Sequence, residues 1–193
     1  MITNTTRRFW YVLLSSFAFL VRYRYFKKWF WAPMLILLLG FAVPQKMIIP
    51  VENADLKSWD EKSFWAYPWG SSITHKGIDI FAEKGTPVVA STNGIVVYTF
   101  DGGKGGKSVM VLGPKWRFHY YAHLDRIETF PLKPLKRGSV IGAVGDTGNA
   151  KGKPPHLHYA ITTPFPYFAL WDDNAVQGWK KIFYLNPDIW LRP

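Results

Sequence analysis

The sequence contains no cysteine, and this absence excludes two kinds of protein chemistry. Without thiols the chain has neither a disulfide framework nor a thiolate metal site, and lipid attachment through an N-terminal cysteine is also excluded. Any bound metal must therefore be held by histidine, aspartate or glutamate. Histidine is itself absent from the first 74 residues and from the last 35, so all five histidines fall between residues 75 and 158. This clustering favours a common site.

Acidic residues are absent from residues 1–50, which carry seven Lys and Arg side chains. The remaining residues carry 17 basic and 13 acidic side chains, so most of the net charge of +11 belongs to the N-terminal segment. That charge therefore says little about the ligand of the rest of the chain. With 193 residues, the chain has room for one domain and an appendage.

The N-terminal 50 residues have the pattern of a membrane anchor. Residues 29–49 are apolar apart from Gln45 and Lys46, and about 20 apolar residues are enough for a helix to cross the hydrocarbon core. Four basic residues lie shortly before this run: Arg22, Arg24, Lys27 and Lys28. By the positive-inside tendency, they place the N-terminus in the cytoplasm. The sequence predicts a single-pass protein of the inner (cytoplasmic) membrane, with everything after Pro50 on the periplasmic, extracytoplasmic side.

Other interpretations of this segment remain open. An earlier apolar run, residues 9–21, is short and flanked by arginines, which favours an interfacial helix over a second span. A buried helix of a soluble protein is disfavoured, because a helix that is apolar on all sides must be covered by a large core. A cleaved secretory signal is the main competitor of the anchor, because Gly40 and Ala42 offer small residues at a possible cleavage site. Both the anchor and the signal predict an exported domain.

Beyond residue 50, the pattern changes to short β-type runs separated by glycine and proline. Seven strands are expected, at residues 78–81, 87–90, 94–100, 108–112, 118–123, 140–144 and 158–162. Together with the turn signals between them, they predict an all-β, antiparallel domain. We assign residues 51–65 to a linker or first cover strand and residues 66–163 to the domain. The aromatic extension, residues 164–193, is expected to pack over the sheet.

Four side chains in this domain form candidate metal-ligand pairs. Side chains at i and i+2 of a strand project from one face, so His156 and His158 point the same way. The i and i+4 pair His75 and Asp79 also shares a face, in a strand or in a helical turn. Two histidines and one carboxylate suit zinc, and three protein ligands leave a fourth position for water.

Of the remaining two histidines, the sequence suggests a role for His123 but not for His119. His123 ends an expected strand, and a neutral imidazole near a metal-activated water can take its proton or donate to a developing oxyanion. His119 has no partner at any recognisable spacing, so we assign it no functional role.

Three motifs in order along the chain resemble those of lysostaphin-type (LytM-like) zinc metallopeptidases, which are peptidoglycan endopeptidases. They are His75-x-x-x-Asp79, Tyr121-Ala-His123-Leu and His156-x-His158. Glycine-containing stretches at residues 85–90, 93–97 and 137–148 resemble the same family. The resemblance covers about residues 66–162 and implies an antiparallel β-sheet domain with a groove across the sheet.

The resemblance also implies a site and a reaction. His75, Asp79 and His158 would hold one zinc ion, and His156 and His123 would be the catalytic histidines. His156 would take a proton from the attacking water and pass it to the leaving amine, while His123 would help to stabilise the oxyanion. The implied substrate is a peptide bond in the stem peptides or cross-bridges of peptidoglycan, reached from the membrane anchor.

Three alternatives are kept beside this hypothesis. A protein of the same fold could bind peptidoglycan without cutting it, or regulate wall hydrolases in cell division. A membrane-linked scaffold could hold a structural zinc, although no fourth protein ligand is evident. Nucleic-acid binding is disfavoured, because the positive charge lies beside the apolar run where membrane topology explains it. Which peptidoglycan bond is cut stays open.

Overall fold

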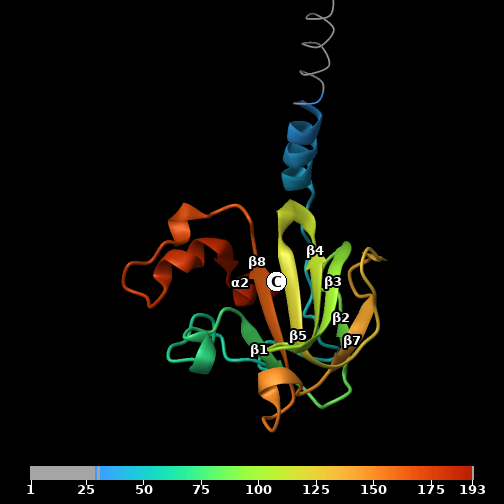
Figure 1. Ribbon diagram of the computed structural model, residues 1–193, viewed down its shortest axis with the longest axis vertical. Helices are drawn as coiled ribbons and strands as arrows, with labels where there is room; N and C mark the ends of the chain where they lie inside the picture. The colour runs from blue at the N-terminus through green and yellow to red at the C-terminus, as the bar shows by residue number, and fades with distance from the viewer. Residues whose placement is uncertain (1–28, 30, 193) are drawn as a thin grey trace, which may run out of the picture. The chain divides into compact units, whose positions relative to one another are not determined.

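The computed structural model describes residues 29 and 31–192. Residues 31–42 are helical, and the chain from Val43 onwards forms a separate compact domain. This domain is built on a nine-stranded antiparallel sheet (Figure 1). Its strands are β1 (Ile78–Phe81), β2 (Pro87–Val89), β3 (Gly94–Gly102), β4 (Gly106–Leu112), β5 (Phe118–Ile127), β6 (Pro134–Leu135), β7 (Val140–Val144), β8 (His156–Thr162) and β9 (Tyr184–Leu185).

The strands follow the order β1-β8-β5-β4-β3-β6, while β7 pairs with both β5 and β2, and β9 pairs with β8. The long strand β5 connects these parts. Its residues 118–122 pair with β8, and its residues 124–127 pair with β7, with a shift in register between Leu124 and Arg126. Such a shift bends a strand locally. The fully buried side chains lie in the layer between these strands, among them Ile78, Val96, Val111, Tyr121, Ile141, Leu157 and Tyr159.

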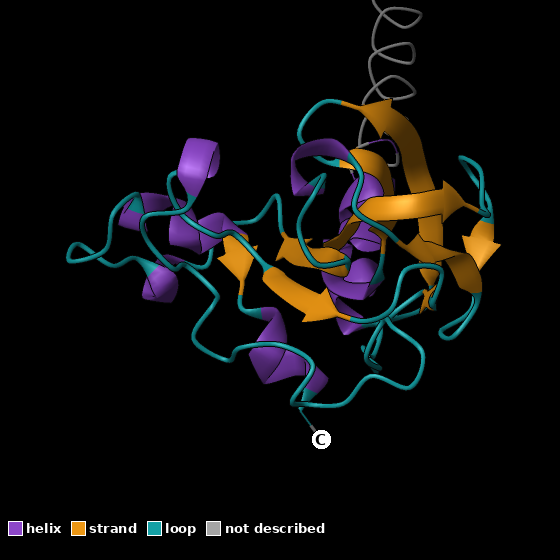
Figure 2. Ribbon diagram, turned by 90° about the horizontal axis from the view of Figure 1, so that it is seen from below, coloured by secondary structure: helices purple, strands orange, loops and turns teal. Residues whose placement is uncertain are grey.

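The predicted antiparallel β domain is confirmed, and all seven predicted strands are present within a few residues of their expected bounds. The two strands that sequence patterns do not reveal, β6 and β9, are two residues long each, too short to show an alternating pattern. Short helices connect the strands and form much of the C-terminal extension: η1 (Gly70–Ser72), η2 (Pro114–Trp116), η3 (Gly148–Ala150), η4 (Phe168–Leu170), η5 (Gly178–Phe183) and α2 (Pro187–Leu191). Most of these helices lie to one side of the strands (Figure 2).

The prediction of one continuous helix over residues 29–49 is wrong in its second part. The helix ends at residue 42, because Pro44 disfavours the helical conformation at Val43. The residues that follow belong to the β domain: Ile48 N donates to Ser91 O at 3.0 Å, and Met47 and Ile49 pack against its core. Their apolar character therefore reflects core packing.

Among the residues that the structure describes, no helix is both long enough and apolar enough to span a bilayer. The predicted interfacial helix at residues 9–21 lies outside the described residues, as do all four basic residues that set the predicted topology.

Residues 51–66, here called the strap, precede β1 in the chain and pack against the domain core. Val51 and Trp59 of the strap are buried, and Trp59 Nε1 donates to Asp188 Oδ1 at 2.9 Å. Asp188 stands in the first turn of α2, where Asn186 caps the helix, and Arg192 binds the same carboxylate at 2.9 Å. The C-terminal extension is thus joined to the strap by a buried hydrogen bond, and it extends the sheet through β9.

Candidate active site

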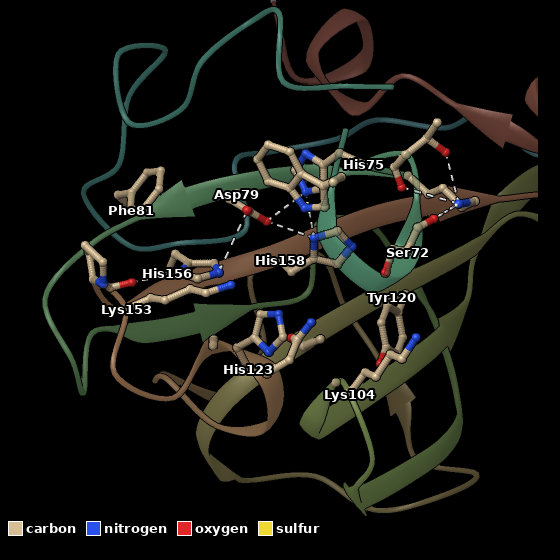
Figure 3. Close-up of a pocket in the computed structure, with 18 residues that line it drawn as sticks. Ser72, His75, Asp79, Phe81, Lys104, Tyr120, His123, Lys153, His156 and His158 are labelled. Carbon is tan, nitrogen blue, oxygen red and sulfur yellow. Dashed lines mark hydrogen bonds and ion pairs between the residues drawn. The ribbon is translucent and has the colours of Figure 1, made fainter. Parts of the chain in front are cut away.

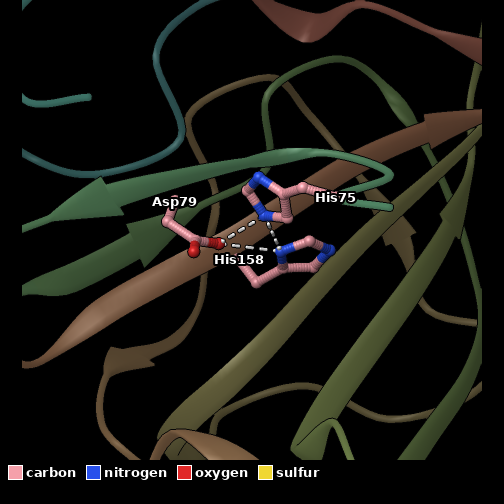
Figure 4. Close-up of side chains that lie close together, drawn as sticks. All are labelled: His75, Asp79 and His158. Carbon is pink, nitrogen blue, oxygen red and sulfur yellow. Dashed lines mark hydrogen bonds and ion pairs between the residues drawn. The ribbon is translucent and has the colours of Figure 1, made fainter. Parts of the chain in front are cut away.

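Three candidate metal ligands meet where β1 and β8 lie side by side (Figure 4). The antiparallel register places Asp79 of β1 directly opposite His158 of β8, and His75 precedes β1. Asp79 Oδ1 lies 2.8 Å from His158 Nδ1 and 3.0 Å from His75 Nε2, and the two ring nitrogens are 3.1 Å apart. The structure therefore brings together the three residues that the sequence motifs single out as ligands.

This donor set fits a zinc ion. Two bonds of about 2.0–2.1 Å at a tetrahedral angle separate their ligand atoms by about 3.3 Å, so small side-chain rotations would admit the ion. Burial alone would raise the pKa of Asp79, but hydrogen bonds from His158 and His75, when the ring nitrogens that face it carry protons, hold it well below its usual range. Burial lowers the pKa of His158. An ionised carboxylate and neutral imidazoles are the forms that bind metal.

His75 is fixed by contacts that no motif indicates. It is 1% exposed, its ring stacks on Trp69 at 4.1 Å between centroids, and its Nδ1 lies 2.9 Å from Ser63 O of the strap. A carbonyl oxygen only accepts, so Nδ1 carries the proton and Nε2 presents its lone pair to the cluster. The sequence gives no signal for the Ser63 contact, because it is made by the backbone.

His156 and His123 lie beside the cluster, with ring centroids 5.1 Å apart in an edge-to-face arrangement. His156 Nδ1 donates to Pro154 O at 2.7 Å, and His123 Nδ1 donates to Thr147 O at 2.9 Å. Each neutral ring therefore keeps an unprotonated Nε2, and that of His156 lies 3.9 Å from Asp79 Oδ2. Burial, with smaller contributions from the charges of His158 and His156, lowers the pKa of His123 to about 4.

The backbone of His123 is held in a left-handed conformation, with φ of 64°, which is uncommon for a residue with a Cβ and requires support from its surroundings. Its N–H donates to Gly105 O at 2.9 Å. The hairpin between β3 and β4 and the η3 loop approach so closely that a Cβ on Gly106 would lie 2.4 Å from Gly148 N. These glycines allow the two loops to hold His123 from both sides.

The five side chains open onto one cavity of about 550 Å³, shown in Figure 3. His156 and His123 lie next to each other, and Asp79 and His158 lie between them and His75. Further lining comes from Trp69, Ser72, Thr74, Lys76, Phe81, Lys104, Gly105, Tyr120, Ala122, Asn149, Ala150, Lys153 and Pro154. The space is large enough for several residues of an extended peptide.

His119 lies on the opposite face of β5 from the site and is fully buried. Its Nδ1 is 2.7 Å from Tyr159 Oη, and its Nε2 is 3.2 Å from Gln45 Nε2. Gln45 in turn accepts a hydrogen bond from the buried Arg117, so His119 belongs to an internal polar chain. Burial lowers its pKa to about 3, and the ring is neutral at physiological pH.

Comparisons with known proteins agree with this geometry. The sequence profile of Peptidase family M23 matches residues 73–170, a range that contains all five site residues. A DD-carboxypeptidase/endopeptidase, Mpg, of Neisseria meningitidis serogroup B is 44% identical over 87 residues, which are 44% of this chain and 19% of that protein. An L-Ala–D-Glu endopeptidase of Bacillus subtilis is 32% identical over 140 residues, or 62% of this chain and 42% of that protein. The chain thus matches less than half the length of each relative.

The fold is also similar to that of a solved structure. The catalytic domain of the antimicrobial peptidase lysostaphin from Staphylococcus simulans superimposes with a TM-score of 0.56 at 24% identity, covering 72% of this chain and 96% of that one. The lysostaphin-like β fold expected from the motifs is therefore confirmed.

Proposed function

Since the chain belongs to peptidase family M23, we propose that it is a zinc-dependent endopeptidase that hydrolyses peptide bonds in peptidoglycan. One observation carries the proposal: three side chains that could bind a metal converge from separate parts of the chain. They lie beside two histidines whose Nε2 atoms are unprotonated in the neutral ring, and all five side chains line one cavity. The activities named for the relatives, a DD-carboxypeptidase/endopeptidase and an L-Ala–D-Glu endopeptidase, support peptidoglycan as the substrate.

His75, Asp79 and His158 would hold the zinc ion through Nε2, Oδ1 and Nδ1. A zinc ion bound there would supply a Lewis acid, making water a better nucleophile and the scissile carbonyl a better electrophile. The strap supports this ligand set through Ser63 O, which fixes the tautomer and orientation of His75. Among the described residues, no fourth protein ligand belongs to this cluster, so a zinc ion bound there would keep a position for water or substrate.

His156 is the proposed general base. Its Nδ1–H is committed to Pro154 O, so Nε2 is the atom that takes a proton from the attacking water and later gives it to the leaving amine. His123 has the same tautomer, set by Thr147 O. A neutral His123 can therefore orient the water as an acceptor, and it can donate to the oxyanion only after it has gained a proton.

We further propose that the N-terminal segment holds the domain at the inner membrane, on its extracytoplasmic side. The support comes from the sequence, in which residues 1–50 carry seven basic and no acidic side chains around long apolar runs. Membrane fractionation, followed by protease treatment of intact spheroplasts, tests this placement. Recovery of the chain in the soluble fraction, or protection of the β domain from protease, would contradict it.

The enzymatic proposal is tested with the purified full-length chain in detergent. Zinc-loaded protein is incubated with peptidoglycan sacculi, and the released muropeptides are identified by mass spectrometry. We expect release of cross-link or stem-peptide fragments that stops with a chelator and returns with zinc. Binding to sacculi without any release, under conditions in which a control endopeptidase digests them, would indicate the non-catalytic alternative.

A further inference from the structure

The charged side chains that line the active-site cavity are uneven in sign. The lining includes three lysines, Lys76, Lys104 and Lys153, but its one carboxylate is Asp79. Asp79 is engaged with His75 and His158, so its charge is directed at the metal position and is not available to the lysines. A bound divalent cation would make the cavity more positive still.

Two of these lysines are available to a ligand. Lys104 extends from the hairpin between β3 and β4, and Lys153 from the loop before β8, so they lie on different walls of the cavity (Figure 3). Both are exposed, and neither belongs to an ion pair with any residue that the structure describes. Lys104 Nζ donates one exposed hydrogen bond of 3.3 Å to Ser71 O, which leaves two of its N–H groups for a ligand. Other lysines are paired: Lys84 with Asp146 at 2.8 Å, and Lys181 with Asp172 at 2.8 Å.

The third lysine contributes charge from a fixed position. Lys76 Nζ donates to Ser72 O at 2.9 Å, Thr74 Oγ1 at 3.0 Å and Thr74 O at 3.3 Å, which uses all three of its N–H groups. Lys76 therefore adds a fixed positive charge to the cavity wall, beside those of Lys104 and Lys153, and such a group of like charges favours an anionic ligand.

We propose that the cavity selects acidic peptides, with Lys104 and Lys153 binding carboxylates on either side of the scissile bond. The substrate is then a stem peptide that carries free carboxylates, and neutral oligoglycine bridges or amidated stems are poor substrates. This inference rests on the proposed endopeptidase function, and it names the substrate class that the same site accepts. Lys104 and Lys153 act in binding, so their effect falls mainly on KM.

The test compares two cross-linked muropeptides that differ in one group, the free α-carboxylate of D-glutamate or its carboxamide, with a pentaglycine peptide as a neutral third substrate. Hydrolysis by the zinc-loaded full-length chain is followed by chromatography. An exposed ion pair strengthens binding by up to about fivefold, so we expect amidation to raise KM by about that factor with little change in kcat. The preference should weaken in high salt, which screens exposed charges.

The decisive variant is Lys104→Gln combined with Lys153→Gln, which should accept the acidic and amidated muropeptides equally. Lys151→Gln is the matched control, since Lys151 is exposed in the same segment as Lys153 but does not line the cavity. Equal KM values for the two muropeptides with the unsubstituted chain, or an unchanged preference in the double variant, would overturn the inference while leaving the endopeptidase proposal intact.

A binding measurement separates the two proposals if nothing is cleaved. The affinities of the same muropeptides for the His156→Ala variant are measured by calorimetry. Tighter binding of the acidic muropeptide supports the selection of acidic peptides even if hydrolysis fails, whereas equal binding refutes it.

Discussion

The buried His119 should make the domain lose stability as the pH falls. Its ring is fully buried and hydrogen-bonded to Tyr159, and burial lowers its pKa to about 3, compared with about 6.5 in an unfolded chain. Below pH 6.5, the unfolded state binds a proton that the folded state does not, so unfolding becomes more favourable. The stabilising effect of a neutral His119 is complete above pH 6.5 and is lost as the pH falls toward 3.

The magnitude follows from these two pKa values. Between pH 6.5 and pH 3, each pH unit of acidification lowers the free energy of unfolding by about 1.4 kcal/mol. The decrease begins gradually around pH 6.5. Between pH 7.5 and pH 5, the expected loss in the free energy of unfolding is about 2 kcal/mol from His119 alone. The variant His119→Asn keeps a polar group near the position of Nδ1 but has no titrating ring, so its stability should change less over this range.

The assay is urea unfolding of the full-length chain in detergent at a series of pH values, followed by tryptophan fluorescence. Excess chelator is present throughout, so that loss of metal at low pH does not contribute. The unsubstituted chain and His119→Asn share all other titrating groups, and the difference between their pH slopes isolates His119. Identical slopes for the two proteins would refute the assignment of His119 as a buried neutral ring.

Three further predictions follow from the site and its supports. His156→Ala should retain zinc but lose hydrolysis, whereas His75→Ala should lose both; equal zinc loss in the two variants, measured by metal analysis, would contradict their division of roles. Asp188→Ala leaves Trp59 Nε1 without its acceptor and should lower the free energy of unfolding by about 1–3 kcal/mol, while Asp188→Asn should cost less; equal urea midpoints for the unsubstituted chain and Asp188→Ala would count against this contact. Gly106→Ala places a Cβ 2.4 Å from a backbone nitrogen at a φ of +60°, so hydrolysis should fall with zinc binding intact; unchanged kcat would show that the two loops do not position His123.

Spacing within the motifs predicts two pairs of side chains, His75 with Asp79 and His156 with His158, and the family resemblance implies that these pairs and His123 meet at one site. Antiparallel pairing places Asp79 opposite His158, and the alternation of side chains along β8 carries His156 to the same face. The strands are predicted by short β-type runs that glycine- and proline-rich turns separate. These runs and the spacing within each motif are local in sequence, whereas the pairing of β1 with β8 is not.

Features that depend on distant backbone contacts escaped prediction. The strap resembled a linker because its contribution to the site is the carbonyl of Ser63, which has no sequence signature. Met47 and Ile49 were assigned to a membrane span because apolar residues look alike whether lipid or a β core covers them, and Pro44 was the local signal that the helix had ended. His119 had no partner at any short spacing, because its partners Gln45 and Tyr159 lie far from it in sequence.

The zinc X-ray absorption spectrum of the purified full-length chain is the most direct test of whether the chain holds one zinc ion with an open coordination position. We expect one zinc per chain with two imidazole nitrogens, one carboxylate oxygen and one solvent oxygen, at distances of about 2.0–2.2 Å. Loss of this signal in Asp79→Ala would complete the assignment. A chain that retains no zinc, or a spectrum with a third imidazole in place of solvent, would contradict it.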